Sequence, residues 1–294
     1  MPNIAANGIK IEYDEFGDRN APPVLLIMGL GAQMILWRDE FCKDLASRGF
    51  RVIRFDNRDV GKSTWFDHLG VPDLLAVVNA AMMRQPSTGA PYFVRDMAAD
   101  AAGLLDALGI ESAHIVGASM GGMIAQNLAI DFPKKVRSLT SIMSTTGDPE
   151  LPQPKAEALN VLLSPQPTTR DEAIERGVLV FRTIGSPGFE FDEPEIRKLA
   201  TLSWERGANP SGVIRQLVAI LASGSRKEAL ASVRVPALVI HGKEDPLVPV
   251  EAGMETAKAI PDAKLLLIDG MGHDMPRPLW PRFVDAISGL AAAA

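Results

Sequence analysis

Short apolar runs alternate with longer segments of helical periodicity through the first half of the chain. Uninterrupted apolar runs, such as residues 24–28, are typical of strands that are covered on both faces. In residues 92–108 apolar side chains recur every three or four positions and a glycine follows, which predicts a helix. Repeated strand–helix–strand units favour a mostly parallel sheet flanked by helices. Strands are predicted at residues 9–13, 24–28, 51–55, 113–117 and 136–142.

This alternation breaks after residue 143. Residues 147–230 contain clustered prolines and several helical segments, but no run that predicts a strand. We therefore expect an α/β core formed by residues 1–146 and 231–294, with residues 147–230 inserted as a helical cap. Residues 64–91 are a second irregular stretch, which we interpret as an insertion near the site. Strand patterns return at 237–241 and 264–268.

Composition and charge exclude several classes of partner. The 294 residues carry a formal net charge of −6 and contain no long basic run, so neither nucleic acid nor an anionic membrane surface is expected as a partner. No apolar run has transmembrane length and the N-terminus has no targeting pattern, so we expect a cytoplasmic protein without membrane insertion. The single cysteine, Cys42, is interpreted as a structural thiol. The sequence leaves a monomer and a homodimer open.

A glycine-flanked serine marks the candidate nucleophile. The segment from Gly117 to Gly122 matches the pattern G-x-S-x-G, with Ser119 as its serine, and follows an apolar run. In this pattern a strand turns sharply into a helix and exposes the serine hydroxyl above the edge of the sheet. Glycine is needed on both sides of the serine because the tight turn brings neighbouring backbone close.

A serine hydroxyl needs a base within hydrogen-bond reach and an acid that orients this base. His273 is the candidate base, because it lies in a glycine-flanked loop directly after the last predicted strand. Asp245 is the candidate acid, because it follows strand 237–241 and precedes a proline that restricts its backbone. Loops that follow parallel strands meet at one edge of the sheet, so we expect Ser119, Asp245 and His273 to lie together.

Other titratable residues are alternatives for these roles. Glu244 competes with Asp245 as the acid, and Asp148, in the loop after strand 136–142, is a more remote alternative. The remaining histidines are interpreted as structural or have no recognisable context. They are His68, His114 and His241.

These motifs, in the order serine, acid, histidine, resemble the α/β-hydrolase superfamily over essentially the full length of the chain. Residues 56–63 are similar to its D-x-R-G-x-G-x-S loop, and residues 28–31 stand where many members have His-Gly-x-Gly. The resemblance implies an eight-stranded, mostly parallel sheet with a helical cap after the sixth strand. It also implies an oxyanion hole formed by the backbone amides of Leu30 and Met120, and no metal or organic cofactor.

Within the superfamily, the segment around Trp37 and the loop 56–63 are similar to small-molecule esterases of the aclacinomycin methylesterase type. The resemblance implies a serine hydrolase that cleaves carboxylic esters of small molecules through an acyl-enzyme. Its expected partner is therefore a small-molecule ester substrate. The candidate residues of the substrate pocket are Gly29, Met143, Phe181 and Trp204.

Several other functions on this fold stay open. Carbon–carbon bond hydrolases and enol-lactonases share the Ser-Met-Gly-Gly turn and are the main alternative, and cofactor-free perhydrolases also keep the triad. Haloalkane dehalogenases and epoxide hydrolases are disfavoured, because they need an aspartate where this chain has Ser119. A ligand receptor that keeps the triad without turnover is a further alternative.

Overall fold

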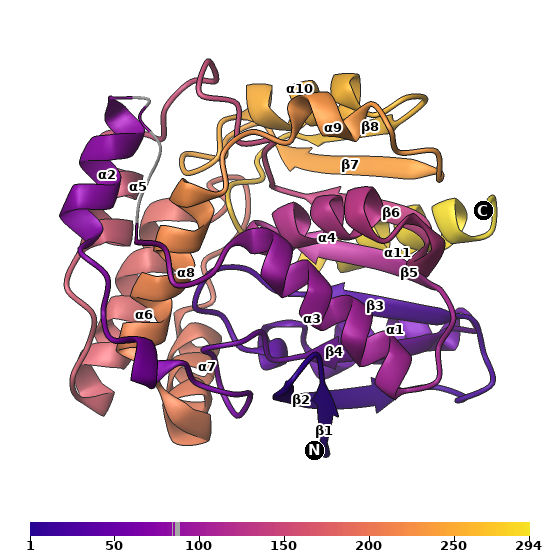
Figure 1. Cartoon of the computed structure of the whole chain (residues 1–294), viewed down its shortest axis with the longest axis horizontal. Coiled ribbons are helices and arrows are strands. Elements are labelled where there is room, and N and C mark those ends of the chain that lie inside the picture. Colours follow the sequence, from indigo (N-terminus) through magenta and orange to yellow (C-terminus); the bar gives the residue numbers. More distant parts are fainter. Residues whose placement is uncertain (84, 86–88) are drawn as a thin grey trace.

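An eight-stranded sheet forms the centre of the molecule (Figure 1). The computed structural model describes residues 1–83, 85 and 89–294. The strand order is β1-β2-β4-β3-β5-β6-β7-β8, in which the β1–β2 and β2–β4 pairs are antiparallel and the remaining pairs are parallel. The strands are β1 (Asn3–Ala6), β2 (Ile9–Phe16), β3 (Pro23–Ile27), β4 (Arg51–Phe55), β5 (Ala113–Ala118), β6 (Val136–Ile142), β7 (Ala237–Gly242) and β8 (Lys264–Ile268).

The apolar runs of the sequence form the predicted strands, and the mostly parallel sheet is confirmed. The prediction from the residues missed β1, which is short and is joined to β2 by a tight turn. Asn7 and Gly8 form this turn at φ 48° and φ 75°. Asn-Gly is the dipeptide that favours such a two-residue hairpin turn, so the sequence did carry a signal for β1.

Alternate residues of the central strands face two apolar layers. On β3, Leu25 and Ile27 pack with residues of α3 and α4, whereas Val24 and Leu26 pack with residues of α1 and α11. Both faces of the sheet are therefore covered, as its uninterrupted apolar strands require. The helices of the two layers are α1 (Asp39–Ser47), α3 (Val94–Ala107), α4 (Met120–Asp131), α9 (Lys227–Leu230), α10 (Val250–Ala259) and α11 (Trp280–Ala291).

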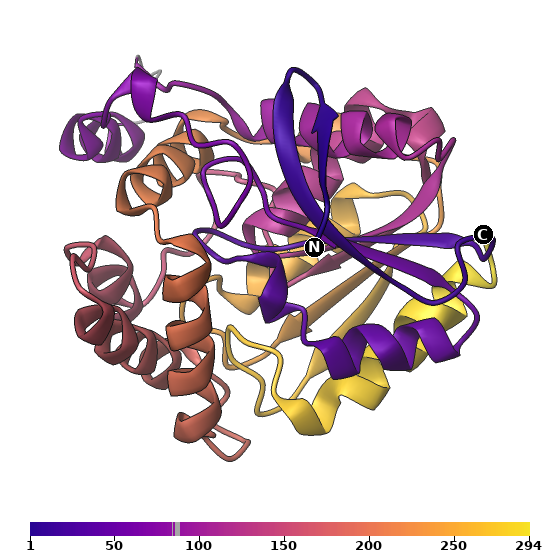
Figure 2. The same cartoon turned by 90° about the horizontal axis from the view of Figure 1, so that it is seen from below.

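Between β6 and β7 the architecture changes. Residues 143–236, all of which the structure describes, contain helices and no strand, and we refer to residues 147–230 as the cap. Figures 1 and 2 show α5 to α8 gathered beyond one edge of the sheet, past the ends of its strands, with α2 beside them. Helix α2 packs against α8. Within the described chain, no helix is both long and apolar enough to cross a membrane. The additional helices are α2 (Leu74–Met82), α5 (Ala156–Leu163), α6 (Arg170–Ile184), α7 (Glu193–Gly207) and α8 (Pro210–Ala222).

The chain enters and leaves the cap at neighbouring points. The backbone N–H of Arg226 donates to the Thr146 carbonyl at 2.8 Å, and its guanidinium donates to the Thr145 carbonyl at 3.0 Å. Gly147 and Gly224 approach so closely that a Cβ on Gly147 would lie 2.6 Å from the Gly224 carbonyl oxygen. The two crossings therefore form one hydrogen-bonded seam between sheet and cap.

Candidate active site

Ser119 lies in the turn from β5 to α4 with φ 56° and ψ −121°, a backbone conformation that is rare for a residue with a side chain. Two glycines make this turn possible. A Cβ on Gly117 would lie 2.0 Å from the Gly121 carbonyl oxygen, and a Cβ on Gly121 would lie 2.1 Å from the Ile27 carbonyl oxygen. The chain can turn this sharply because neither position carries a side chain.

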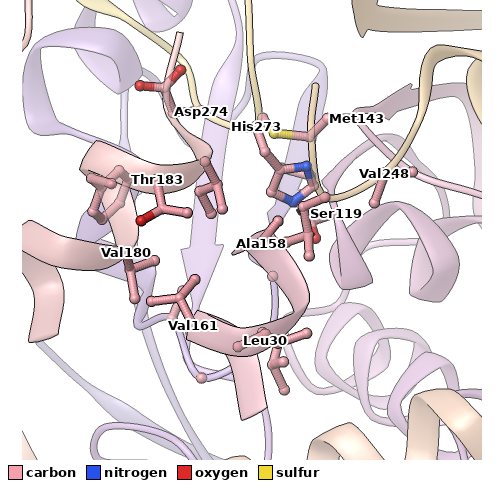
Figure 3. Close-up of a pocket in the computed structure, with 18 of the residues that line it drawn as sticks. Leu30, Ser119, Met143, Ala158, Val161, Val180, Thr183, Val248, His273 and Asp274 are labelled. Atoms are coloured by element: carbon pink, nitrogen blue, oxygen red, sulfur yellow. Dashed lines mark hydrogen bonds between the residues drawn. The ribbon is translucent and has the colours of Figure 1, made fainter. Parts of the chain in front are cut away.

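Three side chains from three strand-end loops form one hydrogen-bonded row. Ser119 Oγ lies 2.9 Å from His273 Nε2, and His273 Nδ1 lies 2.7 Å from Asp245 Oδ2. Because a carboxylate only accepts, Nδ1 of His273 donates to Asp245 and Nε2 accepts from the serine hydroxyl. Figure 3 shows the His273 ring directly beside Ser119. This arrangement can remove the serine proton as the hydroxyl attacks a carbonyl.

The turn after β7 fixes the Asp245 carboxylate. Its Oδ1 accepts from the backbone N–H groups of Leu247 at 2.9 Å and Val248 at 2.8 Å, which leaves Oδ2 for His273. His241 lies behind this turn, fully buried, with Nε2 at 2.8 Å from the Val248 carbonyl oxygen. Burial lowers the pKa of His241, so its neutral ring supports the turn that holds the acid.

The two alternative acids lie elsewhere. Glu244 Oε2 accepts from the Gly270 N–H at 2.6 Å, in the same loop as His273 but away from its ring. Asp148 pairs with Lys227 at 2.6 Å, and this hydrogen bond lowers the pKa of Asp148. The geometry therefore brings Asp245 to the imidazole, and not Glu244 or Asp148.

The two backbone amides predicted as the oxyanion hole, those of Leu30 and Met120, lie near the serine. Met120 is the first residue of α4, and the N–H groups of a first helical turn have no acceptor within the helix. Leu30 lies in the loop after β3, where Gly29 comes so close to Ser119 that a Cβ there would lie 3.1 Å from the serine Cβ. Among the described residues, neither the Leu30 amide nor the Met120 amide has a hydrogen-bond acceptor.

Ser119 and His273 open into a cavity of about 2360 Å³ between the sheet edge and the cap. Drug-sized ligands usually occupy pockets of about 300–1000 Å³, so this space admits a bulky molecule. Figure 3 shows Met143 and Val248 on one side of the histidine, and Ala158 and Val161 of the cap on the other. The candidate pocket residues all line this cavity: Gly29, Met143, Phe181 and Trp204.

The remaining thiol and imidazoles lie away from the reacting atoms. Cys42 is buried, and burial raises the pKa of its thiol to about 12, which agrees with its interpretation as a structural thiol. His114 is buried in β5 with Nδ1 at 2.9 Å from Ser138 Oγ, and burial lowers its pKa. His68 is exposed on the surface.

Two ion pairs, one of them fully buried, join the cap to the loop after β4, a feature that was not predicted from the sequence. Arg215 of α8 donates to both carboxylate oxygens of Asp59, at 2.8 and 2.7 Å, and both side chains are fully buried. The hydrogen bonds that Arg215 donates to Asp59 raise the pKa of Arg215. Arg206 of α7 donates to Asp56 at 2.9 Å. The signal available in the sequence was Asp59 itself, which replaces the glycine of the similar family loop; its φ is 68°.

Comparison with known proteins shows the family. The family described as "alpha/beta hydrolase fold" matches residues 22–276. Over 99% of this chain and 98% of the relative, the sequence is 30% identical to rhodomycin D methylesterase DauP from Streptomyces sp. strain C5. It is 27% identical to a 2-hydroxy-6-oxononadienedioate/2-hydroxy-6-oxononatrienedioate hydrolase from Burkholderia vietnamiensis, over 92% of this chain and 88% of the relative.

Solved structures show the same architecture. The enol-lactonase from Burkholderia xenovorans LB400 superposes with a TM-score of 0.75 and 22% identity, over 99% of this chain and 100% of that chain. At this identity the likeness concerns the fold. The methylesterase relatives and the family match show that the chain is a hydrolase enzyme of the esterase type. The chain belongs to the α/β hydrolase fold family.

Proposed function

We propose that the protein hydrolyses carboxylic esters of small molecules through an acyl-enzyme formed on Ser119. The observation that carries this proposal is the hydrogen-bonded row from Ser119 Oγ through His273 to Asp245, with contacts of 2.9 and 2.7 Å, at the floor of a large cavity. The 30% identity to a methylesterase supports an ester bond as the target.

In the first half of the reaction, His273 Nε2 accepts the Ser119 proton while Oγ attacks the ester carbonyl. The amides of Leu30 and Met120 donate to the oxyanion of the tetrahedral intermediate, and loss of one such donor typically lowers the rate about 10²–10³-fold. Collapse of the intermediate breaks the bond to the alcohol, which leaves with the proton from His273. Ser119 is then acylated.

In the second half, His273 accepts a proton from water as the water oxygen attacks the acyl-enzyme. Asp245 holds the ring in the tautomer that presents Nε2 to the reacting oxygen and stabilises the imidazolium. Collapse returns the proton to Ser119 Oγ and releases the carboxylic acid. The cavity leaves room for a bulky acid or alcohol part, and the relative's name points to a methyl ester as one such substrate.

The test compares the unchanged protein with Ser119→Ala on p-nitrophenyl acetate and butyrate. We expect turnover by the former and a loss of about 10⁴-fold or more in the variant, since the remaining rate comes from binding and the oxyanion donors alone. A fluorophosphonate probe should add one adduct to the intact mass, and only when Ser119 is present. Equal turnover by Ser119→Ala would exclude the acyl-enzyme.

Carbon–carbon bond hydrolysis is the second candidate, and the 27% identity to the oxononadienedioate hydrolase favours it. The same serine, histidine and aspartate would serve that reaction. A vinylogous diketone decides between the candidates, because faster turnover of this compound than of any ester would reverse the order of the two proposals.

A further inference from the structure

One stretch of the cap, residues 184–188 at the end of α6 and directly after it, lies against the loop that carries His273. The His273 N–H donates to the Ile184 carbonyl at 2.7 Å, and the Gly188 N–H donates to the Gly270 carbonyl at 2.9 Å. The two backbones touch elsewhere too, since a Cβ on Gly272 would lie 2.2 Å from the Gly185 carbonyl oxygen. The contact is therefore made by backbone at van der Waals distance.

Ser186 lies in the middle of this contact and bonds to both neighbours of His273. Its Oγ accepts from the Gly272 N–H at 2.9 Å and donates to the Asp274 carboxylate. Asp274 is half-buried, and burial raises its pKa. Within the described chain, no basic side chain forms an ion pair with Asp274, so the Ser186 hydroxyl is the side chain that satisfies it.

The core holds a different part of the same loop. The Glu244 N–H donates to the Met271 carbonyl at 3.1 Å, and the Glu244 carboxylate accepts from Gly270 at 2.6 Å. The N–H groups of Gly272 and His273, in contrast, donate to the cap. Gly270 and Gly272 make the loop permissive in conformation, so the bonds to the cap add to the Asp245 contact in holding His273 in place.

We propose that Ser186 and Asp274 are positioning residues, through which the cap holds His273 at hydrogen-bond distance from Ser119. The proposal rests on the proposed function, since it concerns the same histidine. It makes the cap part of the catalytic apparatus as well as a wall of the cavity. A displacement of about 1 Å at a catalytic group can cost about 10²-fold in rate, so loss of these contacts acts on kcat.

Four single variants test this role in pairs. Ser186→Ala and Asp274→Ala remove the hydrogen bond, whereas Ser186→Thr and Asp274→Asn retain a hydroxyl donor and an oxygen acceptor. We expect the alanine variants to lower kcat for p-nitrophenyl butyrate about 10- to 100-fold with KM changed less than about threefold, and the conservative variants to keep more of the activity. The double alanine variant should lose no more than Ser186→Ala, because Ser186→Ala already removes the contact that the two residues share.

Ser232→Ala is the matched control, because it also removes a serine hydroxyl that donates a hydrogen bond. The Ser232 hydroxyl is exposed and donates to the Ala229 carbonyl at 2.8 Å. Thermal unfolding of every variant separates a loss of folded protein from a loss of positioning. Gly188→Ala tests the contact independently by steric hindrance, since the added Cβ would lie 2.5 Å from Gly270 Cα and push the two segments apart. It should lower kcat in the same way without removing a side-chain hydrogen bond.

A measurement without substrate separates this proposal from the proposed function. The proton between His273 Nδ1 and Asp245 gives a low-field NMR resonance, which is assigned by its absence in His273→Ala. We expect Ser186→Ala to broaden or shift this resonance and Ser186→Thr to restore it, whether or not the protein hydrolyses any ester. An unchanged resonance in Ser186→Ala, or a kcat within twofold of the unchanged protein, overturns the positioning role.

Discussion

The two walls of the cavity are held in place by different kinds of interaction. The core wall consists of loops that follow parallel strands, and its reacting side chains bond to one another and to local backbone. The cap wall is held by long-range contacts, among them the buried pair of Arg215 and Asp59 and the bond from Arg206 to Asp56. Sheet topology thus brings the reacting residues together, whereas the position of the cap depends on ion pairs between its helices and the loop after β4.

This difference has an energetic side. A buried ion pair repays its desolvation only when both partners stay bonded, and removal of one partner leaves an uncompensated charge. Asp59 has further donors in Tyr92 Oη at 2.7 Å and the Phe66 N–H at 2.8 Å, so several segments depend on one carboxylate. In the core wall, each of the three loops that carry Ser119, Asp245 and His273 follows a strand of its own.

The largest expected effect lies in the core wall. Asp245→Asn should lower kcat for p-nitrophenyl butyrate about 10³–10⁴-fold, because an amide at this position no longer fixes the productive tautomer of His273. Steady-state kinetics at neutral pH measure the loss. Glu244→Gln is the neighbouring control and should lose less than about tenfold. An equal loss in both variants would show that the acid has been assigned to the wrong residue.

The next effect concerns the cap wall. Arg215→Met should lower the free energy of unfolding by about 3–5 kcal/mol, since Asp59 then stays buried without its cation. Urea unfolding at pH 7 measures this change. Arg197→Met removes an exposed cap arginine that bonds to Glu175 at 2.7 Å, and its loss should be much smaller. Similar losses in the two variants would remove the distinction between buried and surface pairs.

The smallest effect is a pH dependence within the sheet. Burial places the native pKa of His114 below its ordinary 6.5, so the unfolded chain takes up the proton first as the pH falls. The free energy of unfolding should therefore decrease from about pH 6.5 down to the native pKa, by at most about 1.4 kcal/mol per pH unit. His114→Gln should flatten this part of the stability curve. His68→Gln is the control, because it removes an exposed histidine, and an equal flattening in it would contradict the assignment.

The core could be predicted from the sequence because its signals are local. Apolar runs identify strands, and the glycines around Ser119 and His273 mark tight loops directly after strands. Parallel topology then brings those loops to one edge of the sheet. This is why the contact between Ser119 and His273, which are far apart in the sequence, could be predicted from the sequence.

The cap contacts could not be predicted in the same way. The pairing of Arg215 with Asp59, and of Ser186 with Asp274, depends on how the cap helices pack against the edge of the sheet. The spacing of apolar residues along the chain does not predict that packing. Arginine and aspartate are also common on exposed helical faces, so their types alone do not indicate burial. The one local signal in the sequence was Asp59, an aspartate where the similar loop has glycine. The structure shows that this position has a positive φ.

The hydrogen-bonded seam at Thr146 and Arg226 has a consequence for how such proteins diversify. The cap leaves the sheet and returns to it at residues that are neighbours in space. The whole insert is therefore attached to the core at one place. A different insert can be grafted there without changing the order of any strand. Replacement of the cap in one genetic event would therefore change the cavity and leave the sheet unchanged, provided that the new insert again contacts the loop that carries His273.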